Sequence, residues 1–172
     1  PVDGVTPQVL EHLLKALIRD YTKDIGLKTL AHIDSLTKTT TRHLFNDRLK
    51  QALLSAKRSK ESISLLYFDL DKFKLINDQY GHATGDEFLK TFVAVVKSEI
   101  READTIGRLG GDEFAVLLPK TNDKWAKEIA DRIIAQLNKP KNIKDNTLSI
   151  NTSIGLVSYS GTENKAAFTI RY

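Results

Sequence analysis

The sequence predicts an α+β fold in which helices pack on a mainly antiparallel sheet. Three observations support this prediction. Amphipathic stretches with helical periodicity alternate along the chain with short apolar runs that are typical of strands. The run from residue 62 to residue 71 is almost continuously apolar, as expected for a strand that is covered on both faces. Gly110 and Gly111 separate two further apolar runs, and a glycine pair in such a place predicts a β-hairpin.

Length and composition limit the function classes. A chain of 172 residues, 41% hydrophobic and 28% charged, fits one globular domain. No apolar run is long enough to cross a bilayer. The net charge of +4 comes from scattered lysines, which suit anionic small ligands and give little support for nucleic-acid binding. The absence of cysteine excludes disulfides and thiolate metal sites and agrees with a cytoplasmic location. Because the sequence starts at proline and contains no methionine, we expect it to be part of a longer protein.

The predicted helices follow from apolar residues at helical spacing. They cover residues 8–31, 42–57, 84–100 and 122–137. The segment Asp34-Ser35-Leu36-Thr37 is predicted to cap the second of these helices. Asp86 is expected in the first turn of the third helix, and Trp125 on the inward face of the fourth as a core or rim anchor. Residues 72–82 predict a short helix or loop, and residues 147–159 predict one strand or two strands split near Gly155.

The hairpin is predicted to join a strand at 105–109 to a strand at 114–118. A two-residue turn of the primed type needs positive φ, which glycine adopts without steric cost, so Gly110 and Gly111 are expected to form that turn.

Carboxylates stand at the ends of two predicted strands. Asp69 and Asp71 end the run at 62–71, and Asp112 and Glu113 begin the second hairpin strand. An unpaired charge beside an apolar run is costly, so these residues are not placed there for stability. If the hairpin lies beside the first strand, Asp69 and one of the hairpin carboxylates converge. Such a cluster predicts a divalent cation with oxygen ligands.

Four motifs resemble a known family in the same order. They are Asp34-Ser35-Leu36-Thr37, the stretch 68–86, Gly110-Gly111-Asp112-Glu113-Phe114, and Ser153-Ile154-Gly155. Together they resemble the GGDEF family of diguanylate cyclases, over about residues 30 to 159. The resemblance implies a palm-like, ferredoxin-like βαββαβ core shared with nucleotide cyclases. It also implies a connector helix over residues 1–31 and a GGDEF domain over residues 32–172. The alternative for the first segment is a helix that packs back on its own domain.

The sequence departs from the family pattern in two places. Residues 38–41 read Lys-Thr-Thr-Thr where the family has a glycine, a leucine and an asparagine, which affects the packing of this loop and leaves the carboxylates untouched. After Tyr159 the chain lacks the family's helix, whose lysine and nearby arginine help to hold phosphates. The C-terminal end of the domain is therefore expected to be incomplete.

The resemblance implies that the domain condenses two GTP into cyclic di-GMP and releases two pyrophosphates. Two divalent cations per GTP, Mg²⁺ with Mn²⁺ as the alternative, are expected on Asp69, the Leu70 carbonyl and Asp112. The predicted catalytic residues are Asp112, Glu113 and Lys74. The predicted substrate-binding residues are Asn77 and Asp86 for guanine, with Lys72, Phe73 and Lys74 for the phosphates. The alternative for the two lysines is solvated surface.

Arg101 and Asp104 resemble the family's inhibitory product site, with an ordinary helix-end pair as the alternative. Each domain would bind one GTP, so a homodimer is required for catalysis, and cyclic di-GMP is both product and inhibitor. The full-length protein is expected to carry an upstream sensor domain and is placed in the cytoplasm, with a membrane tether left open for upstream regions. Two functional alternatives remain, namely a catalytically silent receptor for GTP or cyclic di-GMP, and a regulatory module attached to a phosphodiesterase domain.

Overall fold

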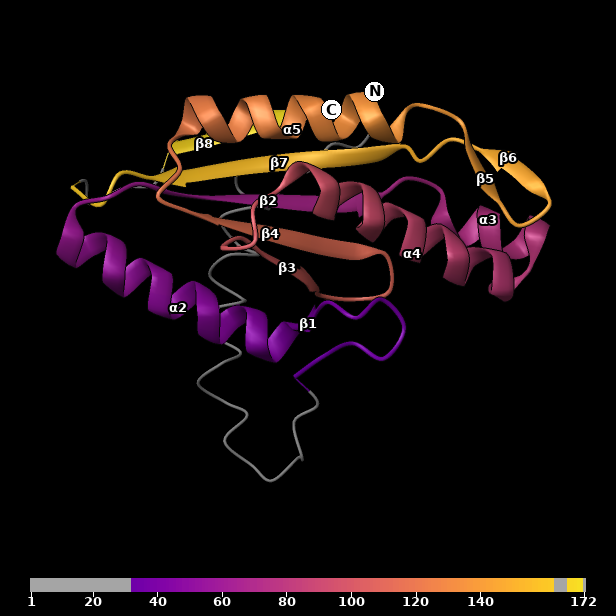
Figure 1. Ribbon diagram of the computed structural model, residues 1–172, viewed down its shortest axis with the longest axis horizontal. Coiled ribbons are helices and arrows are strands. Elements are labelled where there is room, and N and C mark those ends of the chain that lie inside the picture. The colour runs from indigo at the N-terminus through magenta and orange to yellow at the C-terminus, as the bar shows by residue number, and fades with distance from the viewer. Residues whose placement is uncertain (1–31, 163–166, 172) are drawn as a thin grey trace.

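The computed structural model describes residues 32–162 and 167–171 of the 172-residue chain. The helix predicted over residues 8–31 lies outside the described residues. The main sheet has six strands in the order β1-β3-β4-β2-β7-β8 (Figure 1). Its strands are β1 (Thr40–Thr41), β2 (Ile63–Leu70), β3 (Thr105–Arg108), β4 (Glu113–Pro119), β7 (Thr152–Tyr159) and β8 (Ala167–Arg171). A separate two-stranded sheet consists of β5 (Lys141–Ile143) and β6 (Asn146–Leu148).

Strand β2 is the centre of the main sheet. It pairs antiparallel with β4 on one side and with β7 on the other, and its residues Ile63 to Phe68 are all buried. Among the described strands of this sheet, β1 and β3 form the one parallel pair. The predicted antiparallel sheet and the predicted two-sided burial of residues 62–71 are therefore confirmed.

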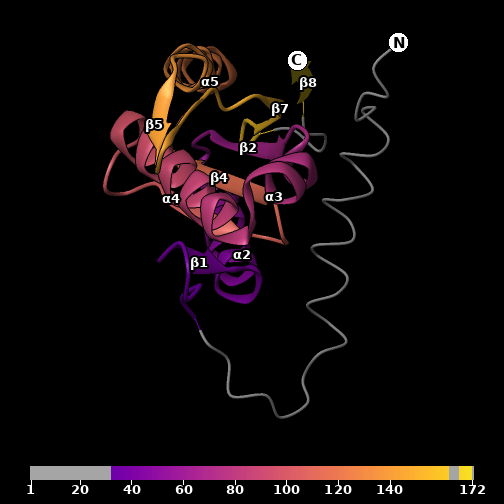
Figure 2. The same ribbon diagram turned by 90° about the vertical axis from the view of Figure 1, so that its right-hand side faces the viewer.

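Helices cover both faces of the sheet. They are α2 (Arg42–Ser59), α3 (Phe73–Tyr80), α4 (His82–Glu99) and α5 (Asp123–Leu137). Figure 2 shows α4 and α5 together on one side of the sheet. Between α4 and the sheet, the ring centroid of Phe92 lies 5.5 Å from that of Phe68 and 4.9 Å from that of Phe114. Helix α4 therefore packs directly on β2 and β4. None of the helices in the described part has the length and apolarity needed to cross a bilayer.

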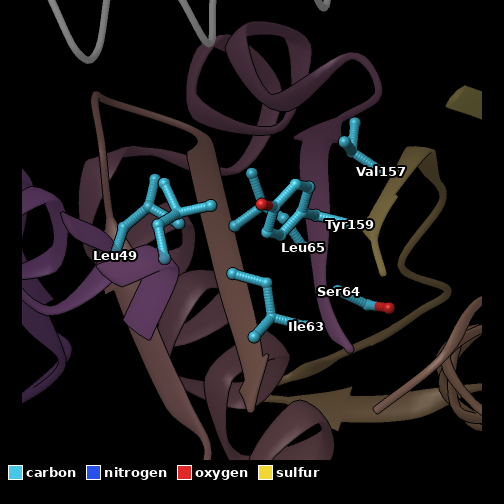
Figure 3. A pocket seen from close by; sticks show the side chains of 7 residues that line it. Leu49, Ile63, Ser64, Leu65, Val157 and Tyr159 are labelled. Carbon is cyan, nitrogen blue, oxygen red and sulfur yellow. The ribbon is translucent and has the colours of Figure 1, made fainter. Parts of the chain in front are cut away.

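Helix α2 packs on the opposite face through Phe45, Leu49 and Ala56. Beside it, an apolar cavity of about 70 Å³ lies between α2 and the ends of β2 and β7 (Figure 3). The cavity is lined by Leu49, Leu53, Ile63, Ser64, Leu65, Val157 and Tyr159.

Three local predictions were wrong for identifiable reasons. Thr41, and not the segment at 34–37, is the N-cap of α2; the Asp34 carboxylate accepts hydrogen bonds from Thr37 within its own turn. The Trp125 side chain is 54% exposed. An α-helix turns by about 100° per residue, so Trp125 lies roughly 90° around the helix axis of α5 from the centre of its buried face. The strand predicted over 147–159 is interrupted at residues 149–151 rather than near Gly155, which is paired inside β7.

Three strands, β1, β5 and β8, were not predicted from the sequence. Thr40 and Thr41 form β1, and the described residues after Tyr159 include β8, which pairs antiparallel with β7. Short edge strands carry too few residues to show an alternating pattern in the sequence.

Candidate active site at the ends of the central strands

An acidic cluster forms where β2 and β4 meet. Asp69 is directly opposite Glu113 in the sheet register. The backbone N–H of Leu70 donates to the carbonyl of Asp112 at 3.3 Å, so the residue before β4 also lies against β2. Burial, followed by the negative charges of Asp112, Glu113 and Asp71, raises the pKa of Asp69 above its usual value. The structure therefore brings the predicted carboxylates into one electrostatic environment that favours a cation.

The donor set fits a cation that binds together with an anionic ligand. In the described part of the chain, no three His, Asp or Glu side chains gather closely enough to hold a metal ion alone. Asp69, Asp112 and the Leu70 carbonyl offer hard oxygen atoms, and Mg²⁺ is usually held by one or two carboxylates together with substrate phosphates. These residues are thus suited to a divalent cation whose remaining ligands come from a nucleotide.

The loop between β3 and β4 differs from the predicted two-residue turn. Neither Gly110 nor Gly111 has a positive φ, and the N–H of Leu109 donates to the carbonyl of Glu113 at 2.8 Å, so the loop spans residues 110–112. A Cβ atom on Gly110 would lie 2.6 Å from Oε2 of Glu113, whereas one on Gly111 would meet nothing within 4 Å. A side chain at position 110 would therefore displace the Glu113 carboxylate, and this glycine matters for space rather than for backbone conformation.

Arg108, at the end of β3, holds this loop through its side chain. Its Nε and Nη2 atoms donate to the Gly111 carbonyl at 3.1 and 2.7 Å, and its Nη1 lies 3.3 Å from Oδ1 of Asp34. Asp34 also accepts hydrogen bonds from the N–H and hydroxyl of Thr37 at 2.8 and 2.6 Å. Burial alone would raise the pKa of Asp34, but the Thr37 hydrogen bonds and the Arg108 charge outweigh it and lower that pKa. The first motif and the glycine loop therefore form one connected unit.

Glu113 has two partners that the sequence analysis missed. The Tyr67 hydroxyl donates to Oε1 of Glu113 at 2.5 Å, and Nη2 of Arg42 lies 3.6 Å from Oε2. Burial, then the hydrogen bond to Glu113 and its charge, raise the pKa of Tyr67 far above the usual value, so this phenol remains a donor. Strand alternation could have identified Tyr67, which faces the same side of β2 as Asp69.

The predicted phosphate-binding residues follow β2 directly. Lys72 precedes α3 with a left-handed φ of 58°, and the side chains of Lys72 and Lys74 are exposed beside the acidic strand end. The ring of Phe73 lies 6.0 Å from that of Phe88 and fixes α3 to α4. The structure therefore gives Phe73 a packing contact, and its contact with substrate stays a prediction.

The packing of α3 on α4 places Asn77 against Gly85, the residue before Asp86. The Asn77 amide packs directly on the backbone of Gly85, so a Cβ atom at position 85 would overlap Oδ1 of Asn77. Helix α4 begins at His82, so Asp86 belongs to its second turn and not to the first turn as predicted. Asp86 is exposed and Asn77 is half-buried, which leaves both side chains near the surface of the α3–α4 junction.

Arg101 and Asp104 lie at the other end of β3. They precede Thr105, whereas the glycine loop follows Arg108, so roughly 17 Å of extended chain separates the two places. Oδ2 of Asp104 accepts a hydrogen bond from the Arg101 backbone N–H at 2.7 Å. Burial raises the pKa of Asp104, although this hydrogen bond and the Arg101 charge oppose the shift. The structure does not bring these residues into the acidic cluster.

The chain matches a known protein family and its members. The family described as “Diguanylate cyclase, GGDEF domain” matches residues 31–171. Diguanylate cyclase TpbB of Pseudomonas aeruginosa is 42% identical over 139 residues, which are 80% of this chain and 32% of that protein. The chain thus spans about a third of that relative's length.

Solved structures agree with the predicted fold. The GGDEF domain of Pseudomonas aeruginosa TpbB has a TM-score of 0.72 and 43% identity, covering 74% of this chain and 76% of that chain. The GGDEF domain of Caulobacter crescentus DgcB, solved in complex with c-di-GMP, has a TM-score of 0.71 and 25% identity, covering 80% of this chain and 83% of that chain. Motifs, fold and comparisons agree, and the chain belongs to the diguanylate cyclase GGDEF domain family.

Proposed function

We propose that this domain is a diguanylate cyclase, a nucleotidyltransferase that condenses two GTP into cyclic di-GMP with release of two pyrophosphates. The observation that carries the proposal is the acidic cluster at the end of β2 and β4, where Asp69 lies opposite Glu113 and beside Asp112. The relatives named diguanylate cyclase support the reaction class.

Asp69, the Leu70 carbonyl and Asp112 would hold the divalent cations, two per GTP, with Mg²⁺ preferred over Mn²⁺. When bound, these ions neutralise the triphosphate and lower the pKa of the attacking ribose 3′-hydroxyl. Lys74 and Lys72, exposed at the start of α3, hold the terminal phosphates with their positive charge. Glu113 contributes a fixed carboxylate that assists proton removal from the attacking hydroxyl.

Asn77 and Asp86 select guanine. The guanine edge presents adjacent N–H donors and a carbonyl acceptor, so a carboxylate takes the donors and an amide N–H serves the acceptor. Their proximity across Gly85 supports this assignment. Because each chain holds one such set, two chains must face each other, each presenting one GTP, before the cyclic product forms.

The test is incubation of the chain with GTP and Mg²⁺, with nucleotides separated by chromatography. Asp112→Ala is expected to abolish cyclic di-GMP formation and to keep the circular dichroism spectrum of the wild type. Turnover retained in this variant would remove Asp112 from the mechanism. Tight GTP or cyclic di-GMP binding without any product from the wild type would instead favour the silent receptor.

Arg101 and Asp104 form the inhibitory product site in this proposal. The c-di-GMP complex of the related DgcB GGDEF domain supports a binding site for the product in this family. Arg101→Ala is expected to raise the cyclic di-GMP concentration needed for half-inhibition by at least about tenfold, because one charge-assisted phosphate contact is worth roughly 1.5–3 kcal/mol. Unchanged inhibition would leave Arg101 and Asp104 as a helix-end pair.

The proposal extends to the full-length protein. Because the chain covers 32% of TpbB, we expect further domains, including an upstream sensor that controls how often two GGDEF domains meet.

A further inference from the structure

Glu113 is restrained at both of its carboxylate oxygens by residues from other elements. The Tyr67 hydroxyl on β2 donates to Oε1 at 2.5 Å. Nη2 of Arg42, at the start of α2, lies 3.6 Å from Oε2. The short hydrogen bond from Tyr67 orients the carboxylate, and the longer ion pair with the half-exposed Arg42 favours the same orientation at the other oxygen.

The place of Tyr67 follows from the register of the sheet. Tyr67 pairs with Ala115, and Asp69 pairs with Glu113, so the Tyr67 ring reaches Glu113 diagonally past a small side chain. Tyr67 is 5% exposed and packs in the cluster under α2, which holds its ring in one orientation. A buried phenol needs a hydrogen-bond partner, and Glu113 supplies it.

Arg42 joins the helix, the glycine loop and Glu113. Its Nε donates to the Leu109 carbonyl at 2.6 Å, and its Nη2 faces Glu113. Gly110 lies at the same carboxylate oxygen, because a Cβ atom at position 110 would lie 2.6 Å from Oε2 of Glu113 and 3.7 Å from Nη2 of Arg42. The carboxylate therefore occupies a space bounded by the loop backbone and by the guanidinium group.

We propose that Tyr67 and Arg42 are positioning residues that hold Glu113 beside Asp69 before the nucleotide binds, and thereby increase the rate of phosphoryl transfer. This inference rests on the proposed function and identifies what orients one of its predicted catalytic groups. A group that is oriented beforehand requires no rearrangement during the reaction. Loss of such a supporting contact typically lowers activity by about 10- to 100-fold.

The test is Tyr67→Phe, which removes the hydroxyl and keeps the ring. The matched control is Tyr159→Phe on β7, because Tyr159 packs against the same cluster and lines the cavity away from the acidic residues (Figure 3). We expect kcat for cyclic di-GMP formation to fall about 10- to 100-fold in Tyr67→Phe, with the KM for GTP within about threefold of the wild type. Tyr159→Phe is expected to keep the wild-type kcat.

A double-mutant cycle separates positioning from stability. In a Glu113→Gln background, Tyr67→Phe is expected to cause no further loss of kcat, because its effect passes through Glu113. Arg42→Lys, which keeps the charge and loses the forked geometry, is expected to show the same dependence on Glu113. An unchanged kcat in Tyr67→Phe, or an equal loss in both backgrounds, would overturn the proposal.

A crystal structure of Tyr67→Phe gives a readout that does not depend on activity. We expect Glu113 to leave its place over Gly110 or to adopt several conformers. A Glu113 side chain in the same place in wild type and variant would refute positioning by Tyr67. Absence of product from the wild type would refute the proposed function instead, so the two failures are distinguishable.

Discussion

The Gly85→Ala variant is expected to weaken GTP binding without lowering the stability of the fold. Gly85 lies in the first part of α4, where alanine is better than glycine by about 1 kcal/mol in helix propensity. Its new methyl group, however, would overlap Oδ1 of Asn77. The overlapping atom is the end of a flexible side chain, so we expect the Asn77 amide to rotate away while α3 and α4 remain in place.

The expected magnitude follows from the hydrogen bond that is lost. If Asn77 serves the guanine carbonyl, removing that contact costs about 0.5–1.5 kcal/mol, or roughly 2- to 12-fold in GTP affinity. Isothermal titration with GTP and a thermal melt of the same sample measure both effects. We expect weaker GTP binding together with a melting temperature equal to or above that of the wild type.

Asn77→Ala serves as the reference variant. It deletes the amide without adding a methyl group, so its loss of GTP affinity is expected to match that of Gly85→Ala, and the double variant to lose no more than either. Unchanged GTP binding in Gly85→Ala would refute the assignment of Asn77 to guanine. A large fall in melting temperature would instead refute the inference that only the Asn77 side chain moves.

Two further predictions concern the first motif and the residue that follows it, Lys38. Lys38 has a left-handed φ of 55°, a conformation that glycine adopts at less cost than lysine. Lys38→Gly is therefore expected to raise the free energy of unfolding, measured in urea, by about 0.5–1 kcal/mol. The control Lys57→Gly lies inside α2 and is expected to lower it by about 1 kcal/mol. Equal signs for the two variants would contradict this. The lowered pKa of Asp34 means that its ionised form stabilises the fold above the ordinary value of 3.8 and that this stabilisation is lost as the pH falls through and below that value. Asp34→Asn is therefore expected to be less stable at pH 7 and to lose less stability on acidification; parallel stability–pH curves would contradict the role of Thr37 and Arg108.

The fold was predictable wherever burial is periodic. β2 is buried on both faces, so its near-continuous apolar run identified it. The helices α2, α4 and α5 each bury one face, so helical spacing placed them within two residues of their observed bounds. Trp125 was misplaced because a residue at the border of an apolar stripe has the same composition signal as one at its centre.

The site was predictable only in part. The sequence identified the acidic cluster because carboxylates beside apolar strands are costly without a partner. It did not identify Arg42 or Tyr67, since their contacts with Glu113 depend on how α2 and β2 lie relative to the glycine loop. The turn at Gly110 was also misjudged, because the steric demand of Glu113 on that glycine arises only in the folded chain.

Residues 38–41, which depart from the family pattern, connect the first motif to β3. Thr39 shares a hydrogen bond with Thr37 at 2.9 Å, and the buried Thr40 donates from its hydroxyl to the Ile106 carbonyl on β3 at 3.0 Å. The Thr40 bond attaches the segment to the strand that leads into the glycine loop, and the Thr37–Thr39 bond holds the segment itself together. Arg42 follows directly and donates to the Leu109 carbonyl, so this segment also leads into a restraint on the glycine loop. Thr40 therefore attaches this segment to β3 by a side-chain hydrogen bond as well as by the pairing of β1 with β3.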